Sequence, residues 1–283
     1  MEIDLEFLNH LKRLSVILNK NVTTSFIGER QSPAIGRGLI FKDHAPYTPG
    51  DDFRTIDWRV YARTDKLFVK RYEEERNLTI HILLDLSASM DYGKSVKKSN
   101  YAAMVAIGFA FMALSKNERF VLSTFSDRLD LFKPKKGRKQ LMDMVSFLNS
   151  RKPSGKTDIA KALVEYRKKV TSKSLIVVIS DFLYDAEELT HGLYAYKDHT
   201  IKLVQVLDKE ELDLNLEGDF RLQDLETNTI MKTFISPFLK KKYGQEMQNH
   251  IANIQRVADS VRAKFHTANT STPVFETFYN ILG

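Results

Sequence analysis

Three oxygen-bearing side chains follow the first long apolar run of the sequence. Residues 78–84 are predicted to form a buried strand, and Asp85, Ser87 and Ser89 come directly after it. Ligands bind at strand ends in parallel sheets because side chains of the loops there are not needed to pack the core. Carboxylate and hydroxyl oxygens are hard ligands that suit magnesium, manganese or calcium rather than zinc or copper. The pattern therefore indicates a divalent-metal site, although Ser and Asp also cap helices.

Two later stretches add oxygen ligands of the same kind. Thr157 is expected to cap a helix over residues 158–170, and Asp181 comes directly after a second apolar strand, 174–180. The full set, in chain order, is Asp85, Ser87, Ser89, Thr157 and Asp181. These types in this order resemble the metal-ion-dependent adhesion site of von Willebrand factor A domains.

The resemblance implies different roles for the hydroxyls and the carboxylates. The serine and threonine hydroxyls would bind the metal directly, and the aspartates would act through water or hydrogen bonds. Neutral oxygens would leave the divalent charge under-compensated, so the open position would take a Glu or Asp of another protein. Mg²⁺ is the expected ion, with Mn²⁺ or Ca²⁺ as alternatives. Asp158 is expected to supply helix N-terminal charge, and Ser180 to shape the strand end.

Strand and helix patterns alternate from residue 78 onward. Such alternation predicts a parallel sheet covered by helices on both faces. We therefore expect an α/β fold with a doubly wound, mostly parallel sheet, as the resemblance to von Willebrand factor A domains also implies. The expected elements are strands 78–84, 120–125, 128–132, 174–180 and 200–207, and helices 96–115, 138–148, 158–170 and 185–196.

The chain is expected to have three parts. Residues 1–77 would hold an N-terminal helix and a small β-rich subdomain, and residues 78–210 the metal-binding domain. Residues 211–283 would add a β-hairpin and C-terminal helices packed on the same domain. The helical spacing in the first part comes from Ile3, Phe7, Leu11, Leu14 and Leu18. The hairpin strands are predicted at 221–225 and 230–234, followed by a helix over 237–264, a strand over 265–269 and a final helix.

A second resemblance rests on the polar segment 47–63. Its sequence, Tyr-x-Pro-Gly-Asp-Asp-x-Arg-x-Ile-Asp-Trp-Arg followed by Ala-Arg and a Glu-rich strand, resembles the signature of a bacterial domain-of-unknown-function family. Members carry a von Willebrand factor A-like domain and are commonly associated with MoxR-type AAA+ ATPases. The resemblance runs from about Gly36 to the C-terminus and implies an adaptor or substrate-delivery role. Within the segment, the interleaved acids and arginines are expected to bond one another.

Composition narrows the classes of protein. The 283 residues are 43% hydrophobic, which can build a core, and the absence of cysteine excludes disulfides and thiol catalysis. No run approaches the roughly 20 apolar residues of a membrane helix, and the N-terminus lacks a signal-peptide pattern. A cytoplasmic protein is therefore expected. The net charge of +7, from 43 basic and 36 acidic residues, selects no particular partner.

Three functions follow from these patterns. The leading hypothesis is a metal-dependent protein-binding module, not an enzyme, that recognises an exposed Asp or Glu of a partner such as a MoxR-type AAA+ ATPase. The alternative is a metal-dependent phosphoesterase, since a metal beside carboxylates can activate water. The third, nucleic-acid binding, rests on charge alone, and a solvated basic surface explains that charge more simply.

Overall fold

The computed structural model describes residues 3, 7, 11, 35, 36, 40–73, 78–132, 139–214, 216, 218–227 and 229–282. Two compact units are present. One combines Met1–Val22 with Leu78–Gly283 and is called the sheet unit here, and the other, the small unit, is Thr23–Asn77.

A six-stranded sheet forms the centre of the sheet unit, in the order β11-β8-β7-β4-β5-β6. All neighbours are parallel except β6, which pairs antiparallel with β5 at the edge. The strands are β4 (Thr79–Asp85), β5 (Arg119–Phe125), β6 (Leu129–Leu131), β7 (Leu175–Ser180), β8 (Thr200–Leu207) and β11 (Lys264–Asn269). The prediction of an α/β fold with a doubly wound, mostly parallel sheet is confirmed.

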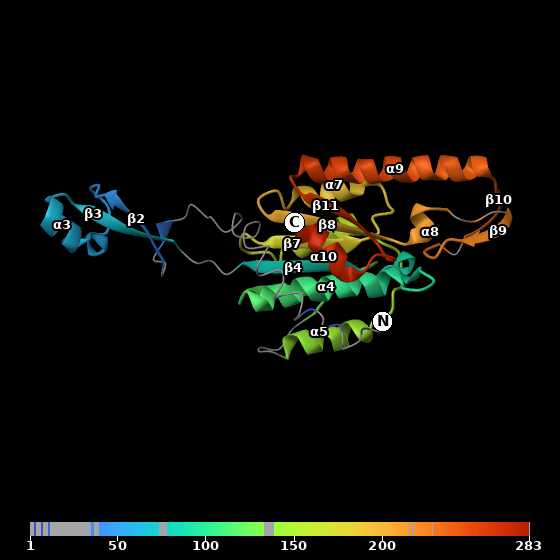
Figure 1. Ribbon diagram of the computed structural model, residues 1–283, viewed down its shortest axis with the longest axis horizontal. Helices are drawn as coiled ribbons and strands as arrows, with labels where there is room; N and C mark the ends of the chain where they lie inside the picture. The colour runs from blue at the N-terminus through green and yellow to red at the C-terminus, as the bar shows by residue number, and fades with distance from the viewer. Residues whose placement is uncertain are drawn as a thin grey trace. The chain divides into compact units, whose positions relative to one another are not determined.

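Helices cover both faces of this sheet, with α4, α5 and α10 on one side and α7 and α9 on the other (Figure 1). The helix α6 packs beside α7 in the same core cluster. Both faces of the central strands are thereby buried, which is why β7 reads as a continuous apolar run. The helices are α4 (Lys98–Ser115), α5 (Gln140–Asn149), α6 (Ile159–Arg167), α7 (Ala186–Tyr194), α9 (Pro237–Ser260) and α10 (Val274–Leu282).

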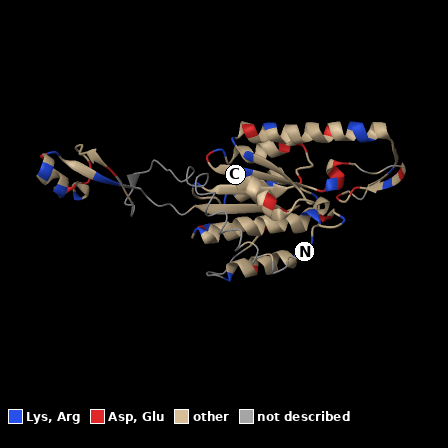
Figure 2. Ribbon diagram, in the orientation of Figure 1, with Lys and Arg blue, Asp and Glu red and all other residues tan. Residues whose placement is uncertain are grey.

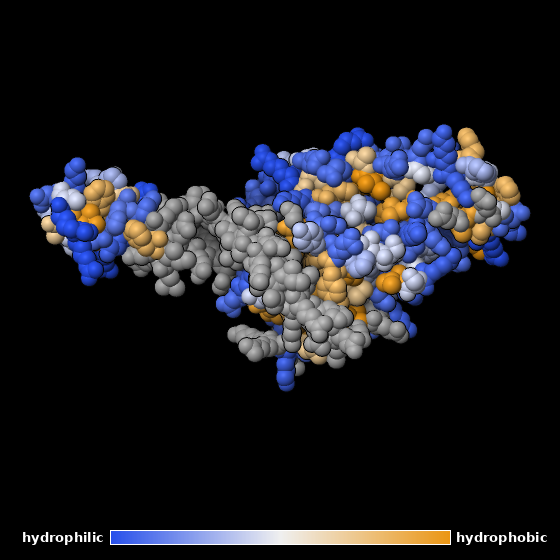
Figure 3. Space-filling model, viewed as in Figure 1, coloured by the Kyte–Doolittle hydropathy of each residue, from blue (hydrophilic) through white to orange (hydrophobic). Residues whose placement is uncertain are grey.

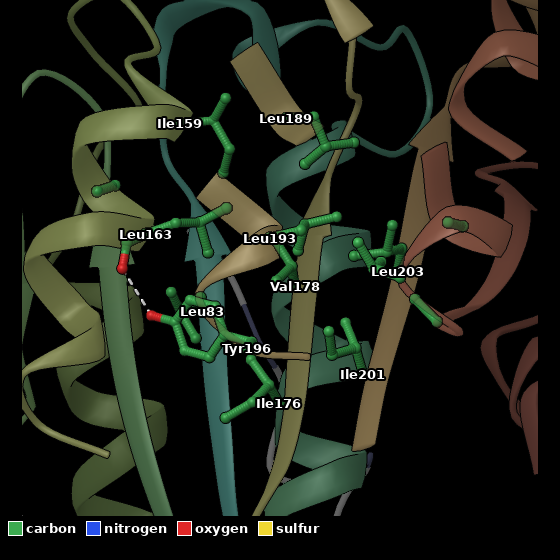
Figure 4. Packing of buried hydrophobic residues seen from close by; sticks show 14 of the residues in the cluster. Leu83, Ile159, Leu163, Ile176, Val178, Leu189, Leu193, Tyr196, Ile201 and Leu203 are labelled. Carbon is green, nitrogen blue, oxygen red and sulfur yellow. Dashed lines mark hydrogen bonds between the residues drawn. The ribbon is translucent and has the colours of Figure 1, made fainter. Parts of the chain in front are cut away.

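Figure 4 shows how the core joins the strands to α6 and α7. Leu83 and Val178 from adjacent strands meet Leu163 and Leu193, and all four side chains are fully buried. The hydroxyl of Tyr196 donates to the carbonyl of Leu163 at 2.6 Å, which satisfies the polar end of a buried ring. Burial of each aliphatic side chain contributes about 1.5–3 kcal/mol. This packing fixes the strand ends that carry the candidate site.

The C-terminal part contains one short helix that the sequence pattern did not predict. The helix α8 (Lys209–Leu212) is held by a capping box between Asp208 and Glu211. After it come β9 (Gly218–Gln223) and β10 (Ile230–Ile235), which pair antiparallel in a two-stranded sheet of their own. The predicted hairpin and the last strand are therefore present. The helix predicted to reach residue 264 ends at Ser260, because the chain enters β11 four residues later.

The N-terminal stretch packs on the sheet unit. Phe7 and Leu11 are helical and buried, and the ring of Phe7 stacks on Phe275 with centroids 5.5 Å apart. The backbone amide of Ile3 donates to Asn149 at 3.0 Å. The boundary predicted at residue 77 placed this stretch with the small subdomain, whereas its contacts group it with the sheet. The predicted helical positions 14 and 18 lie outside the described residues.

The small unit is an antiparallel sheet in the order β1-β3-β2. Its elements are β1 (Ile35–Gly36), β2 (Ile40–Pro46), a 3-10 turn (Phe53–Thr55), α3 (Trp58–Thr64) and β3 (Phe68–Glu73). Ala45, Ile56 and Val69 form its core. Within the described ranges of the whole chain, no helix combines the length and apolar character needed to cross a bilayer.

Candidate metal centre

The candidate site lies where β4 and β7 end side by side. Asp85 is the last residue of β4, and Asp181 follows the last residue of β7. The register of these parallel strands pairs Leu84 with Ile179, so the two carboxylates leave the same edge of the sheet. This is the edge at which ligands bind in open α/β sheets. The predicted placement of Asp85 and Asp181 on neighbouring strands is therefore observed.

Asp85 is completely buried and accepts hydrogen bonds on both oxygens. Its Oδ1 accepts from the backbone amide of Ser87 at 2.8 Å, and its Oδ2 accepts from the hydroxyl of Ser180 at 2.7 Å. Burial, reinforced by the charge of Asp181, raises the pKa of Asp85 to about 7. Ser180 thus holds the central carboxylate, a role beyond the strand-end shape expected from the sequence.

The hydroxyls of Ser87 and Ser89 face each other, with their Oγ atoms 3.0 Å apart. Backbone hydrogen bonds fix the loop that carries them. The amide of Ala88 donates to the carbonyl of Gly155 at 2.9 Å, and the amide of Ser154 donates to the carbonyl of Leu86 at 2.8 Å. Two loops that are far apart in the sequence are therefore tied together beside Asp85.

Thr157 reaches the same site from the second loop. Its hydroxyl lies 3.5 Å from Oδ2 of Asp85 and 3.2 Å from Oε1 of Glu226. The prediction that Thr157 caps the following helix is wrong, because the N-cap of α6 is Asp158, whose carboxylate accepts from the amide of Lys161. Asp158 thereby meets the expected need for charge at the helix start, and the Thr157 hydroxyl is free to face the site.

Asp181 is anchored by a buried lysine that sequence reasoning missed. The ammonium of Lys98, fully buried at the start of α4, lies 2.8 Å from Asp181 and 2.7 Å from Glu211 on α8. Burial disfavours the charged ammonium, but the two carboxylates outweigh it and leave the pKa of Lys98 raised. The amide of Leu183 donates to the other Asp181 oxygen at 3.2 Å. Lys98 lies in the polar run Lys97-Lys98-Ser99-Asn100 at the start of the helix, so the sequence pattern did not distinguish it from a solvated helix end.

A cavity of about 1030 Å³ opens in front of these groups. Ser89, Thr157 and Asp181 line it from the sheet edge, and Asp224 and Glu226 line it from the β9–β10 hairpin. Carboxylates outnumber the lysines in the lining, and Figure 2 shows acidic residues on the neighbouring α8. An acidic cavity attracts cations and repels free phosphate or carboxylate.

These residues fit a divalent cation. Asp85 is a buried carboxylate beside a second acid, and among the described residues its hydrogen-bond donors are hydroxyls and an amide rather than a cation. No group of three His, Cys, Asp or Glu suited to a metal occurs in the described part of the chain. A metal here would therefore depend on the hydroxyls of Ser87, Ser89 and Thr157 as well as on the carboxylates, which is hard-oxygen chemistry.

Residues 43–253 match the model of a protein family that is described as "Protein of unknown function DUF58". It belongs to the DUF58 family. Its relatives include the uncharacterized proteins Rv1480 of Mycobacterium tuberculosis and Mb1516 of Mycobacterium bovis. Each is 27% identical over 251 residues, covering 87% of this chain and 79% of the relative.

Solved structures that resemble this chain include a von Willebrand factor A domain. An aerotolerance-related membrane protein from Bacteroides fragilis aligns at a TM-score of 0.48 and 14% identity, over 72% of this chain and 98% of that chain. The SpRpn10 VWA domain aligns at a TM-score of 0.45 and 13% identity, over 72% and 95%.

Proposed function

We propose that this DUF58 protein is a non-catalytic binding module that recognises an acidic group of a protein partner through a divalent ion. The observation that carries the proposal is that the Ser87 amide and the Thr157 hydroxyl both meet buried Asp85, while the hydroxyls of Ser87 and Ser89 face each other beside it. Ser89, Thr157 and Asp181 line an acidic cavity at this place. Two loops that are distant in the sequence contribute to this arrangement. A solvated helix cap would need only residues of a single loop. The five proposed ligands are Asp85, Ser87, Ser89, Thr157 and Asp181.

Each residue has a distinct part in the proposal. The hydroxyls of Ser87, Ser89 and Thr157 would coordinate the ion, and Asp85 and Asp181 would supply negative charge directly or through water. When bound, Mg²⁺, or Mn²⁺ or Ca²⁺, would offer an electrophilic position to a carboxylate. Lys98 already engages one oxygen of Asp181, so that carboxylate is held in place before any ion arrives.

The acidic cavity makes the expected partner binding strictly metal-dependent. Without an ion, the carboxylates of the lining would repel an incoming Asp or Glu. The same field would repel a phosphoester in the absence of an ion, so the alternative of a metal-dependent phosphoesterase needs the ion equally. A MoxR-type AAA+ ATPase remains the proposed partner, on the strength of the resemblance in segment 47–63.

Calorimetric titration with MgCl₂ tests the metal proposal. We expect saturable binding by the wild type and none by Asp85→Asn, which keeps the shape of the buried side chain, or by Asp85→Ala. Asp213→Asn, a carboxylate after α8 that is not among the proposed ligands, serves as the matched control. Wild-type protein that binds neither Mg²⁺ nor Mn²⁺ at millimolar concentration would overturn the proposal.

A second experiment tests the partner. The purified protein would be mixed with a purified MoxR-type ATPase in Mg²⁺ and in chelator, and complex formation measured by sedimentation. We expect a complex only with Mg²⁺ and only with intact Asp85. A complex of equal strength in chelator would show that any contact with the ATPase does not use the ion.

A further inference from the structure

The β9–β10 hairpin brings a carboxylate of the chain itself to the candidate metal centre. Gln223 and Ile230 form the last pair of the hairpin ladder, and the chain between them makes the tip. Glu226 lies at this tip, and its Oε1 is 3.2 Å from the Thr157 hydroxyl. That hydroxyl also faces Asp85, so the tip touches one of the proposed metal ligands.

Hydrogen bonds within the hairpin tip hold its backbone in place. The carboxylate of Asp224 accepts from the backbone amides of Glu226 at 2.8 Å and Thr227 at 2.9 Å. The amide of Asp224 donates to the carbonyl of Thr229 at 2.9 Å, which closes the turn. These bonds hold Glu226 so that its side chain enters the cavity, where it is half-buried.

Glu226 lines a cavity in which carboxylates outnumber the lysines. Asp181 and Glu211 belong to the same lining, and like charges repel one another. Among the described residues, the neutral hydroxyl of Thr157 is the hydrogen-bond partner of the Glu226 carboxylate on the site side. A divalent ion held by the Thr157 and serine hydroxyls would turn this repulsion into attraction.

We propose that Glu226 is an intramolecular carboxylate ligand of the divalent ion and that it occupies the position an acidic partner would take. The proposal rests on the metal site described above as the proposed function. A partner carboxylate has to displace the hairpin tip before it reaches the ion. Because β9 and β10 form a sheet of their own, the tip can leave while the six-stranded sheet stays intact.

The partner would then meet the hairpin as well as the ion. Leu225 at the tip and Met231 and Phe234 on β10 are exposed apolar side chains. Hydrophobic surface is visible at the end of the sheet unit where β10 meets α9 (Figure 3). An acidic side chain flanked by apolar residues matches both features, so we assign that chemistry to the partner segment.

Manganese titrations of the wild type, Glu226→Gln and Glu188→Gln test the proposal. Glu188 is an exposed carboxylate that lines the same cavity, so its variant removes the same charge without touching Thr157. Affinity would be measured by calorimetry and the water bound to Mn²⁺ by proton relaxation. We expect Glu226→Gln to weaken Mn²⁺ by about tenfold and to increase water relaxation, with little change in Glu188→Gln.

Added acetate provides the second readout. With Mn²⁺ bound, acetate should reduce the water relaxation of Glu226→Gln at concentrations that leave the wild type unchanged, because the ligand position has been vacated. If the wild type binds Mn²⁺ and Glu226→Gln behaves like it in affinity, relaxation and acetate response, the Glu226 proposal is wrong and the metal site stands. Equal losses in both variants would assign the effect to the general field and also overturn it. A wild type that binds neither Mn²⁺ nor Mg²⁺ overturns both proposals.

Discussion

The two units of this protein use their charged residues in opposite ways. In the sheet unit, Asp85, Lys98 and Asp181 are almost fully buried and meet partners far along the chain, such as Glu211. In the small unit, the carboxylates cap turns and helix starts close to them in the chain. Asp51 accepts from Thr48 in a turn, and Asp52 and Asp57 cap the helical turns that follow them.

This contrast explains the polar signature of segment 47–63. Its aspartates specify turns and helix starts, and Asp57 is held by His44 at 2.9 Å and Lys70 at 3.5 Å rather than by an arginine side chain of the described residues, contrary to expectation. Trp58 remains 59% exposed and Phe53 65% exposed. The long signature of segment 47–63 therefore specifies local turns and helix starts. The shorter motif of Asp85, Ser87 and Ser89 meets residues that are distant in the sequence.

Removal of the buried lysine should have the largest effect on stability. Lys98→Ala leaves Asp181 and Glu211 without their cation, and breaking a buried pair on one side costs about 3–5 kcal/mol. Denaturant unfolding followed by circular dichroism would measure this loss in the free energy of unfolding. Lys94→Ala removes an exposed ammonium from Glu210 and should cost less than about 1 kcal/mol. Similar losses of unfolding free energy in both variants would mean that the buried ion pairs stabilise the fold no more than an exposed pair does.

Asp85→Asn should stabilise the metal-free protein at neutral pH while it abolishes metal binding. The pKa of Asp85 is raised from 3.8 to about 7, so the folded state holds a proton that the unfolded state releases. The contribution of Asp85 to stability should therefore fall as pH rises from about 4 to 7, by about 2–4 kcal/mol. Urea unfolding in chelator at several pH values should show the variant gaining stability relative to the wild type across this range. An unchanged difference in stability between the two proteins would refute the assignment to Asp85.

His81 should produce the opposite slope within the same unit. Burial, with the nearby charge of His199, lowers the pKa of His81 from 6.5 to about 4, and its Nδ1 lies 2.7 Å from the Tyr166 hydroxyl. The unfolded state binds the proton more readily, so the contribution of His81 to stability should rise with pH from about 4 to 6.5. His81→Gln should remove up to about 2–3 kcal/mol of this dependence. Unfolding curves across that pH range, compared with an exposed control such as His191→Gln, would check it.

Asp57→Asn should have the smallest effect, confined to the small unit. The pKa of Asp57 is lowered to about 2, first by its hydrogen bond with His44. The stability that this carboxylate contributes is present above pH 3.8 and is lost as pH falls toward 2. We expect hydrogen exchange to speed up at the amides of Arg59 and Val60, which Asp57 caps. Mg²⁺ affinity should not change, and a change there would link the small unit to the site.

The sequence predicts most of the sheet and part of the site. Apolar runs bounded by polar residues located β4, β5, β7 and β8, because strands buried on both faces are apolar throughout. The polar residues after β4 and β7 were predicted to lie at one edge of the sheet, because parallel strands that pair side by side end at the same edge. These features depend on local patterns and on one general rule of α/β sheets.

The remaining parts of the site depend on contacts between distant residues. Lys98 and Asp181 are 83 positions apart, and Thr157 and Glu226 are 69 apart. Neither pair has a periodic pattern, and a glutamate at a hairpin tip is typical of any solvated turn. The capping box of α8 was present in the sequence as Asp208 and Glu211, but a four-residue helix lies below the length at which periodicity is informative.

The separate two-stranded sheet of β9 and β10 has a kinetic consequence. Opening of such a two-stranded hairpin falls in the range of nanoseconds to milliseconds, far faster than unfolding of a six-stranded core. A partner that competes with the tip meets a binding-competent state for only a fraction of the time, and its apparent affinity is reduced by that fraction. If the tip were open ~1% of the time, a micromolar contact would be measured as roughly hundredfold weaker. Substitutions at the hairpin could therefore adjust the sensitivity of the protein while every metal ligand is kept.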